Sequence, residues 1–271
     1  GYCKFRIGKR DSDMKDIKNE AMDETSERQT TVSGEDIGKL GAVVTKSDGV
    51  SLYCITIIGQ IEGHYILPNT QKTTKYEHIL PLLAAVEENP EIHGLLVIIN
   101  TVGGDVEAGL AIAEMLASMK KPTASIVIGG GHSIGIPIAV SCDKSFIVPS
   151  ATMTIHPVRT SGTILGVPQA FLGLEKMQNR ISEFIVSHSG ITKETLTNLT
   201  FRTDEMATDV GTIIDGREAV ECGLIDRIGG LREAIEWLKN TAKEERSEFG
   251  DDKGSGGKGN TEASAEASSV N

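Results

Sequence analysis

The chain has 271 residues, of which 39% are hydrophobic and 24% charged, a balance that is ordinary for a globular protein with a buried core. A formal net charge of −11 without a dense basic stripe argues against a nucleic-acid partner, because phosphate binding needs clustered Lys and Arg. The four cysteines are scattered and form no CxxC pair, which predicts free thiols in a reducing compartment, the cytoplasm (Cys3, Cys54, Cys142 and Cys222).

Composition divides the chain into three parts. Residues 1–48 are polar and charge-rich without a sustained period, which predicts a flexible N-terminal arm. The first 40 residues lack an apolar segment of the signal-peptide kind, so we expect no secretion signal. Residues 243–271 are a low-complexity Gly/Ser/Ala/Glu tail, which we expect to be disordered. Residues 49–242 remain as one compact domain.

Apolar runs and helical periods alternate along this domain. Residues 122–142 carry no Asp, Glu, Lys or Arg, but their glycines and Pro137 favour a buried strand, a turn and a buried helix over a membrane span. Short loops between strands and helices predict right-handed crossovers, and hence an α/β fold of repeated βαβ units with a mainly parallel sheet. The expected strands are 51–58, 94–100, 123–129, 145–148, 152–155 and 224–228; the expected helices are 74–88, 105–119, 133–142, 168–188, 218–222 and 231–242.

Ligands of such folds bind where the carboxyl ends of strands meet helix N-termini, and two glycine turns are expected there. The first, GHSIG (131–135), formally matches GxSxG and would expose Ser133 on a sharp turn at the positive end of a helix. A serine in that place is also a common N-cap. The second turn, Gly103-Gly104, could point amide N–H groups into a cleft, or simply start a helix. Together with the N–H of Ile134, these amides would form an oxyanion hole.

His156, before Pro157 at the end of an expected strand, is the candidate general base for a serine nucleophile. Most single histidines have no catalytic role, and only a position beside Ser133 would give this one such a role. The other histidines are weaker candidates by position (His64, His78, His93, His132 and His188). Three carboxylates are candidates for orienting the imidazole, and the residues alone do not separate them (Asp204, Asp209 and Asp226).

Several strings, in this order and spacing, resemble the Clp protease proteolytic subunit family, peptidase family S14, over about residues 52–240. These are GQIEGH (59–64), ENPEIHGLLVIINTVGGDVEAGLAI (88–112), the segment leading to Ser133, VPSATMTIHP (148–157) and REAVECGLID (217–226). The resemblance implies a crotonase/ClpP-like fold and a Ser–His–Asp endopeptidase that forms homo-oligomeric rings with the active sites inside a chamber. It implies unfolded or short peptides as substrates, an unfoldase as a further partner, and no metal or organic cofactor.

By motif position, the resemblance implies Ser133 as nucleophile, His156 as base, and Gly104 with Ile134 as oxyanion donors. Three features depart from the family pattern. Thr101-Val102 stands where the family has Ser-Pro, and His132 and Ile134 flank the nucleophile in place of a small residue and Met. Gly211 aligns with the triad Asp, so the resemblance points to Asp209, two residues earlier, as the third member, with Asp204 as second choice.

Three alternatives remain open from the sequence. A crotonase-type acyl-CoA enzyme would use the same paired amides without a Ser–His pair. A Ser–Lys dyad would need a lysine at the site, for which Lys144 and Lys176 are nearest in sequence. A catalytically degenerate ring protein that modulates a partner would fit Gly211. The long helix 168–188 has an apolar face that would serve ring contacts or pack on its own sheet, formed by Phe171, Leu174, Met177, Ile181, Phe184 and Ile185.

Overall fold

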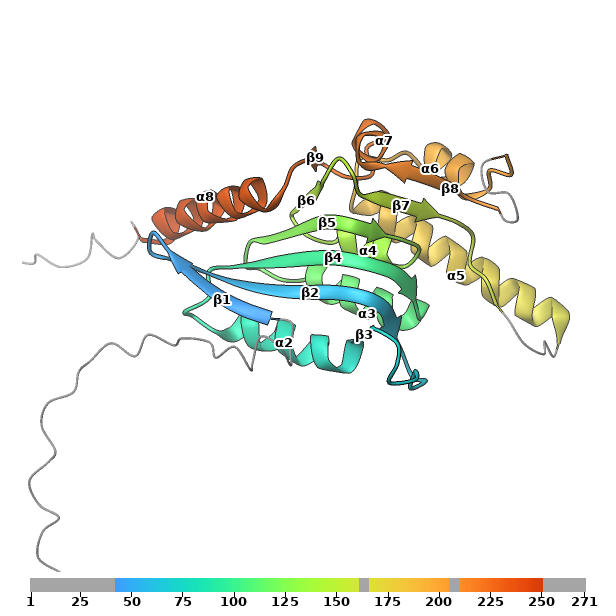
Figure 1. Cartoon of the computed structure of the whole chain (residues 1–271), viewed down its shortest axis with the longest axis horizontal. Helices are drawn as coiled ribbons and strands as arrows, with labels where there is room; N and C mark the ends of the chain where they lie inside the picture. Colours follow the sequence, from blue (N-terminus) through green and yellow to red (C-terminus); the bar gives the residue numbers. More distant parts are fainter. Residues whose placement is uncertain (1–41, 161–165, 205–209, 251–271) are drawn as a thin grey trace, which may run out of the picture.

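A computed structural model describes residues 42–160, 166–204 and 210–250, which form a mixed α/β fold around one large sheet (Figure 1). Its main path runs β1-β2-β4-β5-β6-β9, and every pair along that path is parallel except β1 and β2. These strands are β1 (Ala42–Ser47), β2 (Val50–Glu62), β4 (Gly94–Gly104), β5 (Thr123–Gly131), β6 (Lys144–Ile147) and β9 (Arg227–Ile228).

Three short strands extend the sheet. β3 (Thr73–Lys75) pairs with the end of β2 in parallel. β7 (Thr152–Ile155) joins β5 at a single residue pair, Gly130 with Thr152, and pairs antiparallel with β8 (Thr212–Asp215). The β7–β8 ribbon therefore starts beside the carboxyl end of β5 and carries the chain to His156.

Helices cover both faces of the sheet. Figure 1 shows α2 (Tyr76–Glu88), α3 (Val106–Ala117) and α4 (Gly135–Val140) on one face, and α8 (Leu231–Gly250) on the other. The two faces follow from the period of two in the strands: Leu95 and Val97 belong to the core under α2–α4, whereas Leu96 packs with Leu238 of α8. Each such side chain contributes about 1.5–3 kcal/mol when it is fully buried.

A second group of helices lies beside the β7–β8 ribbon. It consists of α5 (Val167–Ser187), α6 (Lys193–Thr200) and α7 (Gly216–Glu221). Figure 1 shows the N-terminal part of α5 extending away from the sheet. Its C-terminal residues Phe184 and Ile185 are buried in the main core, whereas Val167 and Phe171 are 68% and 65% exposed. The apolar face of α5 therefore packs into the core at its C-terminal end and is exposed at its N-terminal end.

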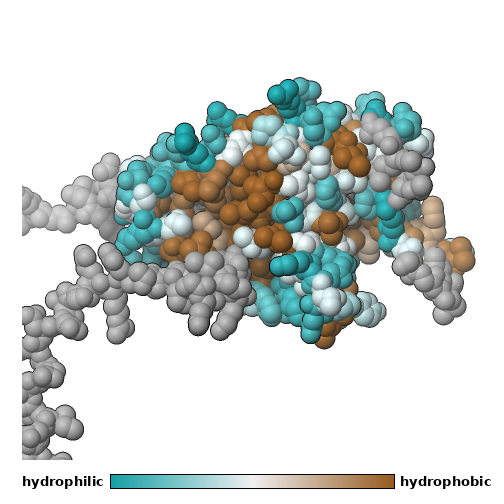
Figure 2. All heavy atoms as spheres, viewed as in Figure 1, coloured by the Kyte–Doolittle hydropathy of each residue, from teal (hydrophilic) through white to brown (hydrophobic). Residues whose placement is uncertain are grey.

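The described part of the chain does not fully cover the sheet on the α8 side. Ile58 follows Leu52 and Cys54 on the same face of β2, and Ile128 follows Ala124 and Ile126 on β5, yet Ile58 and Ile128 are 41% and 45% exposed. Figure 2 shows an apolar area over the sheet in this view. Within the described ranges, no helix combines the length and the apolar character that a membrane crossing requires.

The α/β class and the mainly parallel sheet confirm the prediction from the sequence, and most elements lie within two or three residues of their expected positions. Two boundaries were wrong. β1 lies inside the segment 1–48 that we expected to be an arm, and α8 continues to Gly250, into the expected tail 243–271. Four elements were not predicted: β1, β3, α6 and β8. The expected strand 224–228 is reduced to β9.

Candidate active site

Ser133 occupies a strained turn between β5 and α4. Its φ is +56°, one of two positive values among the non-glycine residues that the structure describes. Such a backbone costs about 1–3 kcal/mol and points to a functional constraint. The turn is held on both sides, since the Ser133 N–H donates to the Thr154 carbonyl at 2.9 Å and the His132 N–H to the Thr101 carbonyl at 3.2 Å.

The glycine pair at the end of β4 lies directly against this turn. A Cβ built on Gly103 would come within 2.7 Å of the Ser133 Cβ, and one on Gly104 within 2.2 Å of the Ile61 carbonyl oxygen. Both glycines also have positive φ, +88° and +153°. No other residue fits there without a backbone shift, so the two glycines permit the close approach of β4 to Ser133.

The amides of Gly104 and Ile134 are suited to face an oxyanion. The Gly103 N–H donates to the Thr101 hydroxyl at 3.1 Å, and the Asp105 N–H to the Ile61 carbonyl of β2 at 3.0 Å. Because N–H groups alternate along a strand, the Gly104 N–H is directed to the opposite side, away from β2. The Ile134 N–H donates to no group among the described residues. This arrangement favours Gly104 and Ile134 over Gly103 as donors.

His156 directly follows β7. Its Nδ1 lies 2.7 Å from the Pro157 carbonyl oxygen. A carbonyl only accepts hydrogen bonds, so Nδ1 carries the hydrogen. The lone pair of the neutral ring is then on Nε2, the nitrogen that a general base uses toward a serine.

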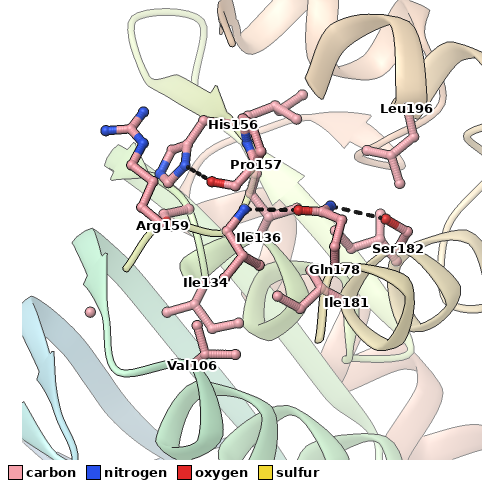
Figure 3. Close-up of a pocket in the computed structure, with 15 residues that line it drawn as sticks. Val106, Ile134, Ile136, His156, Pro157, Arg159, Gln178, Ile181, Ser182 and Leu196 are labelled. Carbon is pink, nitrogen blue, oxygen red and sulfur yellow. Dashed lines mark hydrogen bonds between the residues drawn. The ribbon is translucent and has the colours of Figure 1, made fainter. Parts of the chain in front are cut away.

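A pocket of about 160 Å³ joins these groups, and its wall includes Ser133, Gly104, Ile134 and His156 (Figure 3). Of the six histidines, His156 is the one in this wall. The structure thus brings together the candidate nucleophile, the candidate base and two of the amides that the sequence singled out. The rest of the wall is mostly apolar and comes from α3, α4, α5, α6 and the end of β7, with Val106, Ile136, Ile155, Pro157, Val158, Ile181, Ile185 and Leu196.

Three polar residues of the pocket were not anticipated from the sequence. They are Arg159, which follows His156 by three residues, and Gln178 and Ser182 on α5. The Gln178 Oε1 accepts a hydrogen bond from the Val158 N–H at 2.8 Å, and its Nε2 donates to the Ser182 Oγ at 3.3 Å. The only signal for these residues in the sequence is the spacing of Gln178 and Ser182, which lie one helical turn apart.

The expected third triad position holds no carboxylate. Gly211 lies against His156, and a Cβ on it would be 2.9 Å from the His156 Cβ. Asp204 is exposed and pairs with Arg202 at 3.5 Å. Asp226 accepts hydrogen bonds from the N–H and the hydroxyl of Ser145, which gives it a structural role away from the pocket. Asp209 lies outside the described residues.

The lysines of a Ser–Lys dyad are not at the site. Lys144 pairs with Asp226 at 3.5 Å, and neither Lys144 nor Lys176 belongs to the pocket wall. His132, next to Ser133, contacts β7 instead: its Nδ1 lies 2.8 Å from the Thr154 hydroxyl, and burial lowers its pKa. Within the described ranges, no three His, Cys, Asp or Glu side chains are grouped so that they could hold a metal ion.

The family model described as Clp protease matches residues 51–232. Translocation-enhancing protein TepA of Halalkalibacterium halodurans is 54% identical over 205 residues, 75% of this chain and 80% of that protein. ATP-dependent Clp protease proteolytic subunit 1 of Protochlamydia amoebophila is 29% identical over 146 residues, 52% of this chain and 68% of the relative.

A solved structure shares the fold. A mutant of ClpP1 from Listeria monocytogenes superposes with a TM-score of 0.54 at 22% identity, covering 67% of this chain and 94% of that one. The family match spans well over half of the sequence, including Ser133, His156 and the glycine pair. The chain therefore belongs to the Clp protease family.

Proposed function

We propose that the protein is a serine endopeptidase that hydrolyses peptides or unfolded proteins through an acyl-enzyme on Ser133. One observation carries the proposal: the strained Ser133, the Nδ1-protonated His156 and the amides of Gly104 and Ile134 share one pocket. This is the set of parts that acyl transfer requires, namely a nucleophile, a base and preorganised donors for an oxyanion.

In the first half-reaction, the Ser133 Oγ attacks the carbonyl carbon of the scissile peptide, and its proton passes to the His156 Nε2. The carbonyl oxygen becomes an oxyanion that accepts hydrogen bonds from the Gly104 and Ile134 amides, each worth about 3 kcal/mol. The imidazolium then protonates the leaving amine as the C–N bond breaks, which leaves an ester on Ser133. A water molecule, deprotonated by His156, hydrolyses that ester and restores the hydroxyl. The family resemblance points to Asp209 as a third triad member, whereas the Nδ1 hydrogen of His156 is directed here to the Pro157 carbonyl oxygen.

The pocket wall indicates the substrate. Its side chains are mainly apolar, which favours an apolar substrate side chain next to the scissile bond. A chain must be extended to place a backbone carbonyl at Ser133 and an adjacent side chain in this pocket. We therefore propose unfolded polypeptides and short peptides as substrates, with an unfoldase as a partner for folded proteins.

We further propose that the protein assembles into homo-oligomeric rings in the cytoplasm. Two exposed apolar surfaces support assembly: Ile58 and Ile128 on the sheet, and Val167 and Phe171 on α5. The thiols Cys54 and Cys142 are free and buried, which fits a reducing compartment. Size-exclusion chromatography with light scattering tests the assembly, since a stable monomer at micromolar concentration would exclude a chamber.

A second candidate function is that of a degenerate ring protein that modulates an active partner. Gly211, in contact with His156, favours this candidate, because an orienting carboxylate can contribute about 10⁴ in turnover. An acyl-CoA enzyme of the crotonase type needs no Ser–His pair, so the joint position of Ser133 and His156 argues against it.

Hydrolysis of internally quenched peptides with an apolar residue before the scissile bond separates these candidates. We expect turnover by the wild type and a loss of at least about 10³-fold in Ser133→Ala. Ser150→Ala, an exposed serine outside the pocket, is the matched control and should retain full activity. A folded, oligomeric wild type that cleaves none of the peptides, or a Ser133→Ala variant as active as the control, would contradict the proposal.

A further inference from the structure

The peptide group between Pro157 and Val158 is held at both ends by side chains (Figure 3). Its carbonyl oxygen accepts from the His156 Nδ1 at 2.7 Å, and its N–H donates to the Gln178 Oε1 at 2.8 Å. Gln178 is itself fixed, because its Nε2 donates to the Ser182 Oγ one turn further along α5. A continuous hydrogen-bonded chain thus runs from α5 to the imidazole.

We propose that Gln178 is a positioning residue for the general base and acts on His156 through the Pro157–Val158 peptide. The inference rests on the proposed function of His156. A peptide group is planar, so fixing its N–H also fixes the direction of its carbonyl. That carbonyl holds the hydrogen on Nδ1 and leaves the lone pair on Nε2 for Ser133.

The peptide fills a role that a carboxylate plays in a Ser–His–Asp triad. A triad carboxylate accepts the Nδ1 hydrogen and sets tautomer and ring direction. Here Gly211 offers no side chain, and the Cβ contacts around it leave no space for one. The Nδ1 hydrogen goes instead to a neutral carbonyl, and Gln178 restricts the movement of that carbonyl.

Position 178 uses a side chain that both accepts and donates a hydrogen bond. The Val158 N–H needs an acceptor, which an apolar side chain would not provide in a wall that is otherwise largely apolar. Glutamine offers one acceptor and one donor group, and both are used, by Val158 and Ser182. Since Gln178 lies on α5 and His156 follows β7, this contact also ties the base to the long helix.

The test uses full-length protein with three substitutions: Gln178→Ala, which removes the acceptor; Gln178→Glu, which keeps it; and Gln169→Ala, an exposed glutamine on the same helix, as control. The first readout is the second-order rate of fluorophosphonate labelling of Ser133 from pH 6 to 9. We expect about a 10-fold loss in Gln178→Ala, since even small misplacement of a base is costly. Gln178→Glu should stay within about 3-fold of wild type, with its pH profile shifted upward by the added negative charge. Gln169→Ala should match wild type.

The second readout does not depend on activity. Protein with ¹⁵N-labelled histidine reports the tautomer of His156, whose signals are assigned by their loss in His156→Asn. The wild type and Gln169→Ala should show the Nδ1–H form, and Gln178→Ala a mixture of tautomers. If the wild type is not labelled, the proposed function fails, and the tautomer spectra still decide the role of Gln178.

Two results would overturn the inference. One is a Gln178→Ala variant with wild-type tautomer and, where the wild type is labelled, wild-type labelling. The other is a loss of about 10⁴-fold in Asp209→Asn without any effect of Gln178→Ala, which would assign the orienting role to a carboxylate.

Discussion

Gly211 is packed against His156 so closely that its Cα cannot carry a side chain in the present backbone. A Cβ there would lie 2.4 Å from the Ile155 carbonyl oxygen and 2.9 Å from the His156 Cβ, and the φ of Gly211 is +138°. Its N–H donates to the Arg202 carbonyl at 2.8 Å, which fixes its position from the other side. The glycine is therefore a structural requirement of this site as well as a departure from the family triad.

The close packing of Gly211 against His156 predicts what happens when the aspartate of the family triad is restored at this position. Gly211→Asp should destabilise the fold by about 2 kcal/mol or more and should not raise fluorophosphonate labelling, because the new Cβ displaces the strand that carries His156. Urea denaturation measures the first effect and the labelling rate the second.

Gly173→Asp is the matched control, since Gly173 is exposed on α5 and a Cβ there would meet no atom within 4 Å. Its stability should change by less than about 1 kcal/mol. A Gly211→Asp protein that is stable and labels faster than wild type would show that the site readily accepts a carboxylate.

The positive φ of Ser133 predicts an order of stabilities. Ser133→Gly should be more stable than Ser133→Ala by about 0.5–1 kcal/mol, because glycine adopts the left-handed backbone without strain. The difference is smaller than the full strain energy, since glycine also gives the unfolded chain more conformational entropy. Thermal or denaturant unfolding of the two inactive variants checks this. Equal stabilities, or a more stable alanine variant, would mean that the turn is not strained.

His93 predicts a pH dependence of stability. Its Nδ1 accepts the Ser51 N–H at 3.0 Å, and burial, then Arg246, lower its pKa. A depressed histidine pKa favours the neutral form in the folded state, so this contribution is present above about pH 6.5 and is lost as the pH falls. Unfolding free energies at pH 5–8 should therefore fall toward pH 5 in the wild type and fall less in His93→Gln. Burial also lowers the pKa of the half-buried His132, so a smaller pH dependence of the unfolding free energy remains in His93→Gln.

An identical pH dependence in His93→Gln and in the wild type would contradict the assignment to His93. His78→Gln, on the exposed side of α2, serves as the control and should keep the wild-type slope.

Burial also predicts thiol reactivity. It raises the pKa of Cys54 to about 11 and that of Cys142 to about 12, whereas Cys222 is only half-buried. In a Cys3→Ser background at pH 8, a disulfide reagent should modify Cys222 first, and Cys54 and Cys142 only after unfolding. Peptide mass spectrometry locates the adducts. Fast modification of Cys142 in the folded protein would contradict the packing of α4.

The sequence indicated those parts of the site that depend on local chemistry. Ser133 and the pair Gly103-Gly104 sit at strand–helix junctions, where a turn residue and a nucleophile have recognisable neighbours. The position of Gly211 against His156 depends instead on the pairing of β7 with β8, two strands that are far apart in sequence. The role of Gln178 likewise depends on where α5 crosses the end of β7. Such contacts have no local signature.

There are also physical reasons why the sequence did not predict some of the elements. β1 is half polar and gains its order from pairing with β2, and α6 is polar apart from Leu196 and Leu199, so neither has a strong period of its own. α8 continues through Lys243–Ser247 because Lys, Glu and Arg are good helix formers, although their charge resembles that of a disordered tail.

The most direct test of the account is to locate a fluorophosphonate adduct on the purified protein by peptide mass spectrometry, beside Ser133→Ala and His156→Ala. The account predicts one stoichiometric adduct on Ser133, absent from Ser133→Ala and strongly slowed in His156→Ala. A folded, oligomeric wild type without an adduct, or with one that survives both substitutions, would contradict it.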